Sequence, residues 1–252
     1  PAARGAPPAA RGGEPPAQGR QGLKLMPRGA SSSAGAAAPS KPEKPPPFTQ
    51  EELSKKMGNT IEEYLECGDF KEVCTCLAEW VPRAPPEGDP LAKQLVQLAI
   101  SQVIEGRGEE PRDKVGRLIG ALFSEKALKS AELKALLSDA LEFIEDEVCD
   151  VPHIALYYAK FLGYALASGA LPLGWCGEAV GHLVESQMVK ADMALGGQAG
   201  AAFVIAKALS ICKGINGEER TKALYAEASF DFKPLLKNSG SAAEVAALLE
   251  AA

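Results

Sequence analysis

The chain has 252 residues and a formal net charge of −6. Its charges are unevenly distributed. Residues 1–47 are basic, with seven basic and two acidic side chains, and residues 48–252 are acidic, with 20 basic and 31 acidic side chains. The acidic part repels phosphate backbones, which argues against its binding nucleic acid directly. Six scattered cysteines and the lack of an apolar run of roughly 20 residues exclude a small secreted disulfide framework and a membrane-spanning helix, so we expect a cytoplasmic protein.

Residues 1–47 are nearly all Pro, Ala, Gly, Ser, Arg and Lys. They have almost no side chains to bury, so we expect a disordered basic linker. The triplet Arg11-Gly12-Gly13 is typical of arginine-glycine tails that contact RNA weakly through charge, and the alternative is a solvated linker without a partner. Residues 48–252 are rich in Leu, Ala, Val and Ile, and we predict that they form one folded domain.

The elements of this domain are predicted to be helices, because no segment shows sustained period-2 alternation with β-branched residues. Thr49 and Glu52 form a capping-box pattern before the first helix, and Asp89 and Pro90 are expected as N-cap and first-turn residue of the third. In chain order, the expected helices cover residues 53–66, 70–80, 90–106, 111–123, 133–144, 151–165, 177–189, 200–212, 218–228 and 242–251. Their spacing and short loops predict an all-α, HEAT-like stack of antiparallel helix pairs.

The fifth and sixth of these helices meet at a segment that we call the acidic elbow, residues 145–152, with the sequence EDEVCDVP. Each helix has one apolar stripe, so we expect the two to pack as a hairpin. The stripes consist of Leu133, Leu136, Leu137, Leu141 and Ile144 in the first helix, and of Ile154, Tyr157, Tyr158, Phe161, Leu162 and Ala165 in the second.

Asp146 and Asp150, four residues apart in the acidic elbow, would hold negative charge at one end of the hairpin, where it suits a basic partner. The alternative is that Asp150 only caps a helix that begins at Val151 and that the acidic residues before it form a solvated last turn. Acidic side chains near a helix C-terminus oppose the helix dipole, so stability alone does not account for residues 145–147.

Other candidate chemistry is weak. His153 and His182 are the only histidines, and neither lies near a nucleophile in a recognisable motif. Cys74 and Cys76, two apart on a helix, point in different directions and cannot bind one zinc ion together. The glycine-rich segment 196–200 precedes a helix, but no strand leads into it and no Lys-Ser/Thr follows. We therefore expect no catalytic residue, no metal and no cofactor.

Three segments together resemble the MA-3 domain of the eukaryotic translation initiation factor 4G scaffold family. They are the acidic elbow with the aromatic helix that follows it, the opening TQEELSKKMGNTIEEYLECGDFKEVCTCLAEW of residues 49–80, and the closing YAEASFDFKPLL of residues 225–236. The resemblance implies a HEAT-like domain that binds the DEAD-box RNA helicase of translation initiation as a scaffold and not as an enzyme. The paired acidic residues that contact the helicase in related domains correspond here to Asp146 and Asp150, and Pro152 and His153 lie in the same motif.

Two alternatives remain open at this point. An MA-3 type translation inhibitor would compete for the same helicase surface, but such proteins usually have two copies of the domain, and Asp-Val-Pro occurs once here. An RNA-binding module would depend on the basic residues 1–47.

Overall fold

The computed structural model describes residues 45–184, 200–228, 231 and 233–236. Within these ranges every regular element is a helix, which confirms the predicted all-α class. By its contacts the chain divides into two units, residues 1–44 and 45–252, and the helices belong to the second. The expected linker (apart from residues 45–47), the segment 196–199 and the expected helix 242–251 lie outside the described residues.

The second unit contains the following helices: α1 (Gln50–Cys67), α2 (Phe70–Trp80), η1 (Val81–Arg83), α3 (Leu91–Ile104), α4 (Glu109–Ser124), α5 (Ser130–Glu142), α6 (Ile144–Glu147), α7 (Ile154–Ala167), α8 (Leu173–Ala179), η2 (Gly181–Val184), α10 (Ala201–Asn216), α11 (Glu218–Glu227) and η4 (Lys233–Leu236). Within the described part of the chain, none of them is long and apolar enough to cross a membrane.

Capping residues determine where α1 begins and ends and where α2 begins. The Thr49 hydroxyl accepts a hydrogen bond from the Glu52 amide at 3.2 Å, and the Glu52 carboxylate accepts one from the Thr49 amide at 2.9 Å, which confirms the capping box. Gly68 ends α1 with a left-handed φ of 76°, a conformation that glycine adopts without strain. The Asp69 carboxylate then accepts a hydrogen bond from the Lys71 amide at 3.0 Å and starts α2.

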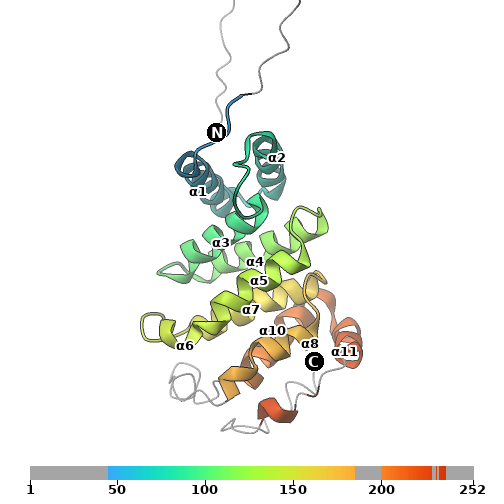
Figure 1. The fold of residues 1–252 in the computed structure, drawn as a ribbon. Coiled ribbons are helices and arrows are strands. Elements are labelled where there is room, and N and C mark those ends of the chain that lie inside the picture. The colour runs from blue at the N-terminus through green and yellow to red at the C-terminus, as the bar shows by residue number, and fades with distance from the viewer. Residues whose placement is uncertain (1–44, 185–199, 229–230, 232, 237–252) are drawn as a thin grey trace, which may run out of the picture. The chain divides into compact units, whose positions relative to one another are not determined.

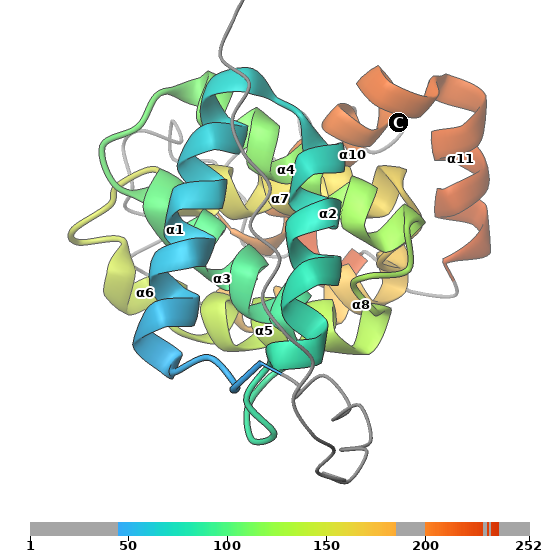
Figure 2. The ribbon, with the colours of Figure 1, turned by 90° about the horizontal axis from the view of Figure 1, so that it is seen from above.

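The helices of the second unit form the expected stack, with α1 and α2 at one end and α10 and α11 toward the other (Figure 1). Viewed from above, α1 and α2 lie side by side over α3 and α4 (Figure 2). α7 is the central element, because it packs against α4 on one side and α10 on the other. The stack buries one continuous apolar core.

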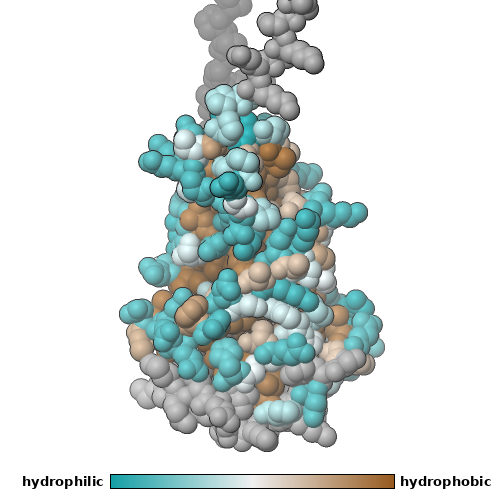
Figure 3. Space-filling model, viewed as in Figure 1, coloured by the Kyte–Doolittle hydropathy of each residue, from teal (hydrophilic) through white to brown (hydrophobic). Residues whose placement is uncertain are grey.

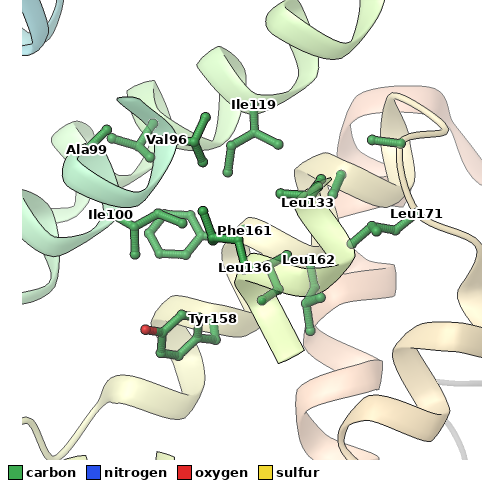
Figure 4. Close-up of a cluster of buried hydrophobic side chains, with 14 of the residues drawn as sticks. Val96, Ala99, Ile100, Ile119, Leu133, Leu136, Tyr158, Phe161, Leu162 and Leu171 are labelled. Carbon is green, nitrogen blue, oxygen red and sulfur yellow. The ribbon is translucent and has the colours of Figure 1, made fainter. Parts of the chain in front are cut away.

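The expected hairpin of residues 133–144 and 154–165 needs correction. The backbone of α7 approaches α4 and α10 most closely, and α5 has α3 and α8 among its neighbours. Large side chains join α5 to α7 instead, because Leu133 and Leu136 lie in the same buried cluster as Phe161 and Leu162 (Figure 4). All residues of the two predicted stripes are buried except Tyr157, which is half-buried.

Two helix boundaries also differ from expectation. Of the predicted helix 177–189, residues 177–179 lie in α8, which starts at Leu173 directly after Pro172, and residues 181–184 form η2. Residues 185–189 lie outside the described residues. Proline at the N-cap position suits a helix start, and the burial of Leu173 favours the earlier turn. Asp89 does not cap α3: Pro90 occupies the N-cap position, and the Asp89 carboxylate pairs with Lys93 at 3.0 Å.

Candidate partner-binding site

The acidic elbow is a series of tight turns between α5 and α7. Residues 145–147 of the elbow belong to the short helix α6. The Val151 amide then donates a hydrogen bond to the Glu147 carbonyl at 2.9 Å. The Ile154 amide then donates to the Val151 carbonyl at 3.0 Å. Ile144 and Ile154 are both fully buried at the two ends of this segment. Buried ends and consecutive backbone hydrogen bonds hold the elbow in one conformation, which keeps its side chains in fixed positions.

The four predicted site residues, Asp146, Asp150, Pro152 and His153, are all exposed in the structure. α7 begins at Ile154 with His153 at the N-cap position, so the alternative that Asp150 caps a helix starting at Val151 is wrong. The reason is the extra turn at Pro152, which delays the helix. His153 lies beside Tyr157, with 6.3 Å between the ring centroids.

Charge in this region is one-sided. Lys134 and Lys160 are the nearest basic residues in the sequence, and six acidic residues lie between them. These residues are Asp139, Glu142, Glu145, Asp146, Glu147 and Asp150. Within the described ranges, none of the six carboxylates forms an ion pair. A surface on which six carboxylates lie close in sequence without forming ion pairs attracts a basic partner.

Arg112 of α4 joins the end of α3 to the start of α7, directly after the elbow, and this role could not be expected from a motif. Its guanidinium donates to the carbonyls of Val103 and Ile104, at 3.0 and 3.4 Å, where α3 ends. The same group lies 3.5 Å above the ring of Tyr157, at the start of α7. The side chain is only 6% exposed. The one sequence signal is that Arg112 lies three residues before Val115, on the core-facing stripe of α4.

Two clefts open beside the acidic elbow. The first, which we call the α3–α5 cleft, has a volume of about 510 Å³ and lies between α3, α5 and the elbow. The second, the α3–α7 cleft, has about 650 Å³ and includes Arg107, Arg112, Pro152 and Tyr157. Asp150 lines both clefts, and Asp146 lines neither. The predicted pair of aspartates is therefore divided between the edge of the clefts and the open surface.

Burial affects one carboxylate of the first cleft. Partial burial raises the pKa of Glu147 above its usual value, and the nearby Glu105 carboxylate raises it further. Both groups lie in the lining of the α3–α5 cleft. A carboxylate whose charged form is disfavoured in this way gains from a cation placed between it and its neighbour. Glu105 lies outside the acidic elbow in sequence, so no local pattern indicated this pairing.

The other residues considered from the sequence, His182, Cys74 and Cys76, make ordinary contacts within the fold. The Nε2 atom of His182 lies 3.1 Å from the Leu141 carbonyl oxygen. Cys74 and Cys76 are half-buried free thiols, and burial is the main cause that raises the pKa of each. Among the described residues, no group of three or more His, Cys, Asp and Glu side chains could hold a metal ion.

We expect the six free thiols to react with alkylating agents at very different rates. Cys67 and Cys149 are exposed, whereas Cys176 is buried, and burial raises the pKa of Cys176 to about 12. Because only the thiolate reacts, this raised pKa slows alkylation of Cys176 in addition to the shielding by the fold. Iodoacetamide should therefore label Cys149 long before Cys176, measured by mass spectrometry of peptides. Equal rates in the folded protein, with the denatured protein as control, would contradict the packing of α8.

Comparison of the sequence with known protein families finds a match that covers the region of the clefts. Residues 53–172 match the family model of the MA3 domain, which is just under half of the chain. The matched region runs from α1 to the residue before α8 and includes the acidic elbow and both walls of the clefts. The resemblance expected from the sequence is thereby confirmed over this region.

Translation initiation factors of three organisms are similar to part of this chain. Eukaryotic translation initiation factor 4 gamma 1 of Oryctolagus cuniculus is 33% identical over 127 residues, which is 50% of this chain and 9% of that protein. Eukaryotic translation initiation factor 4 gamma 3 of Homo sapiens is 29% identical over 126 residues, 50% of this chain and 8% of that protein. Eukaryotic translation initiation factor 4G of Triticum aestivum is 29% identical over 147 residues, 55% of this chain and 9% of that protein. The chain thus spans less than a tenth of the length of these relatives.

Proposed function

We propose, from the MA3 match over residues 53–172, that this chain contains a helicase-docking module of a cytoplasmic translation-initiation scaffold, and that the acidic elbow contacts the DEAD-box RNA helicase of that process. The match and the names of the relatives support a role in translation initiation. The module would contribute binding and no chemistry, so that ATP and RNA belong to the partner. Docking that favours one arrangement of the helicase lobes would act by a population shift, limited by the difference in affinity between the two arrangements.

One observation carries the proposal. Asp146 and Asp150 are exposed on a turn with buried ends, and neither carboxylate has an ion-pair partner among the described residues. The helix cap that would have given Asp150 a structural role is not formed, because α7 begins four residues later. Two fixed carboxylates without a structural task are suited to a basic partner surface, such as arginine and lysine side chains of the helicase.

Reversing both charges is the direct test. We expect Asp146→Lys combined with Asp150→Lys to weaken binding of the helicase at least about 10-fold, which corresponds to about 1.4 kcal/mol. The melting temperature should hardly change, because both side chains are exposed and bear no cap or ion pair. Binding is measured by isothermal titration calorimetry at two ionic strengths, and unfolding by calorimetry. The neutral pair Asp146→Asn and Asp150→Asn should give an intermediate loss.

A matched control separates local contact from general charge. Glu63 and Glu66 are exposed on α1 and have no ion pair in the described part of the chain. Glu63→Lys with Glu66→Lys changes the net charge by the same amount on α1, outside the acidic elbow, and we expect helicase affinity to stay within about 2-fold at physiological salt. Equal losses in both double variants would mean that only net charge matters. Unchanged affinity in the elbow variant would remove the proposed contact.

The sign of the effect on the helicase separates a scaffold from an inhibitor. A scaffold that favours the productive arrangement of the two helicase lobes should raise RNA-stimulated ATPase activity when the domain is added. An inhibitor of the same surface should lower it. In either case the elbow variant should have a weaker effect than the natural sequence, whereas the α1 control should match the natural sequence.

A further inference from the structure

The α3–α5 cleft is apolar at its base. Its lining includes Ile100 and Ile104 from α3, Leu136 and Ala140 from α5, and Tyr158 from α7. Figure 4 shows Ile100 and Tyr158 at one side of the buried cluster and Leu136 nearer its middle. In the space-filling view, hydrophobic surface is visible between hydrophilic side chains at the level of α3 and α5 (Figure 3). A groove of about 510 Å³ is large enough for one or two side chains of a partner.

Carboxylates surround this apolar base. Glu105, Asp139, Glu147 and Asp150 all lie in the lining. Lys93 is the only basic residue of the lining, and its ammonium group is paired with Asp89 at 3.0 Å. The other four carboxylates have no ion pair among residues that the structure describes. The cleft therefore presents unneutralised negative charge beside apolar surface.

Phe143 adds an aromatic side chain to the lining. It is 55% exposed, although most large apolar side chains of the domain are buried. Phe143 also occupies the cap position shared by α5 and α6, so the backbone there is fixed by neighbouring helices. An exposed aromatic ring beside carboxylates can cover an incoming side chain and stack on a planar cation.

We propose that the α3–α5 cleft is a docking groove for a protein segment that presents an arginine next to an apolar side chain. The apolar side chain would lie on the base between α3 and α5. The guanidinium would reach Glu105 and Glu147, with Phe143 covering one face. Arginine fits better than lysine, because its planar fork can bind two carboxylates and stack on a ring. The groove shares Asp150 with the proposed helicase contact but does not include Asp146, so substitutions of Asp146 distinguish the two proposals.

A peptide of defined chemistry tests the groove. The probe is a fluorescein-labelled, alanine-based helical peptide in which leucine and arginine recur four residues apart on one face. Binding to the full chain is followed by fluorescence anisotropy. We expect saturable binding that is at least about 3-fold weaker when lysine replaces arginine and absent when glutamate replaces it. No saturable binding of the arginine peptide at millimolar concentration would overturn the proposal.

Variants locate the binding. We expect Glu105→Gln with Glu147→Gln, and separately Phe143→Ala, each to raise the Kd of the arginine peptide about 10-fold. Glu142→Gln is the matched control, because Glu142 is exposed next to Phe143 but does not line the cleft. Its Kd should be unchanged. An equal loss in the Glu142 variant, or no loss in the cleft variants, would place the peptide elsewhere and overturn the groove.

The two proposals can fail separately. Asp146→Lys alone should weaken the helicase complex and leave binding of the arginine peptide within about 2-fold, because Asp146 lies outside the cleft lining. Phe143→Ala should weaken the peptide complex whether or not the helicase binds. Loss of peptide binding with Asp146→Lys would mean that the probe reports the elbow charge and not the groove.

Discussion

Replacing Arg112 by alanine is expected to lower the free energy of unfolding by about 3 kcal/mol. The substitution removes the donors to the carbonyls of Val103 and Ile104 and the stack on Tyr157 at the same time. An unsatisfied buried carbonyl costs about 1–3 kcal/mol, and loss of the buried side chain leaves a void beside it. Chemical denaturation followed by circular dichroism measures the change. The residual folded protein should also bind the helicase more weakly, since the start of α7 loses its support.

Two variants show whether this effect is specific. Arg107 lies five residues before Arg112, and its guanidinium pairs with Glu62 at 2.6 Å on the surface, where the two side chains are 36% and 50% exposed. Arg107→Ala should therefore cost under about 1 kcal/mol. Arg112→Lys keeps the charge but lacks the planar fork, so it should recover only part of the loss. A loss under about 1 kcal/mol for Arg112→Ala as well would show that Arg112 contributes no more than an exposed ion pair.

The elements that the sequence predicts well are those with local causes. The capping box of Thr49 and Glu52 begins α1, and the pattern of Gly68 and Asp69 separates α1 from α2, because both depend on side chains within three residues. Helical periodicity also identifies the buried residues of α5 and α7. The exposure of Asp146 and Asp150 follows from the same pattern, since both lie off the apolar stripe.

What the sequence does not show depends on contacts between distant segments. The role of Arg112 requires the end of α3 and the start of α7 to meet at one guanidinium. The proximity of Glu105 and Glu147 joins residues 42 positions apart. The sequence also predicted the wrong neighbour for α7. Periodicity shows that a helix has an apolar face, but it does not show which helix packs against that face. The predicted start of α7 lies three residues too early, because Pro152 precedes the helix rather than lying inside it, and α8 begins directly after Pro172, four residues before the expected start.

Close backbone approach between α7 and α10 leads to the second large prediction. A Cβ atom added to Gly163 would lie 2.7 Å from the Cβ atom of Ile211 and 2.8 Å from the backbone oxygen of Ala208. Neither neighbour is the far end of a flexible side chain, so the helices must move apart. Such overpacking typically costs about 1–3 kcal/mol. We expect Gly163→Ala to lower the free energy of unfolding by about 2 kcal/mol, or the melting temperature by about 5 °C, although alanine favours the helix by about 1 kcal/mol.

Gly58 provides the opposite expectation from the same substitution. It lies inside α1, and an added Cβ atom would meet only the Nε2 atom of Gln102 at 3.9 Å, an ordinary contact. Gly58→Ala should therefore stabilise the domain by up to about 1 kcal/mol through helix propensity alone. Opposite signs at the two glycines, measured by thermal and chemical unfolding, would show that Gly163 is required by the packing of α7 on α10. Stabilisation at both positions would mean that these helices lie further apart, and the clefts that depend on the position of α7 would then change as well.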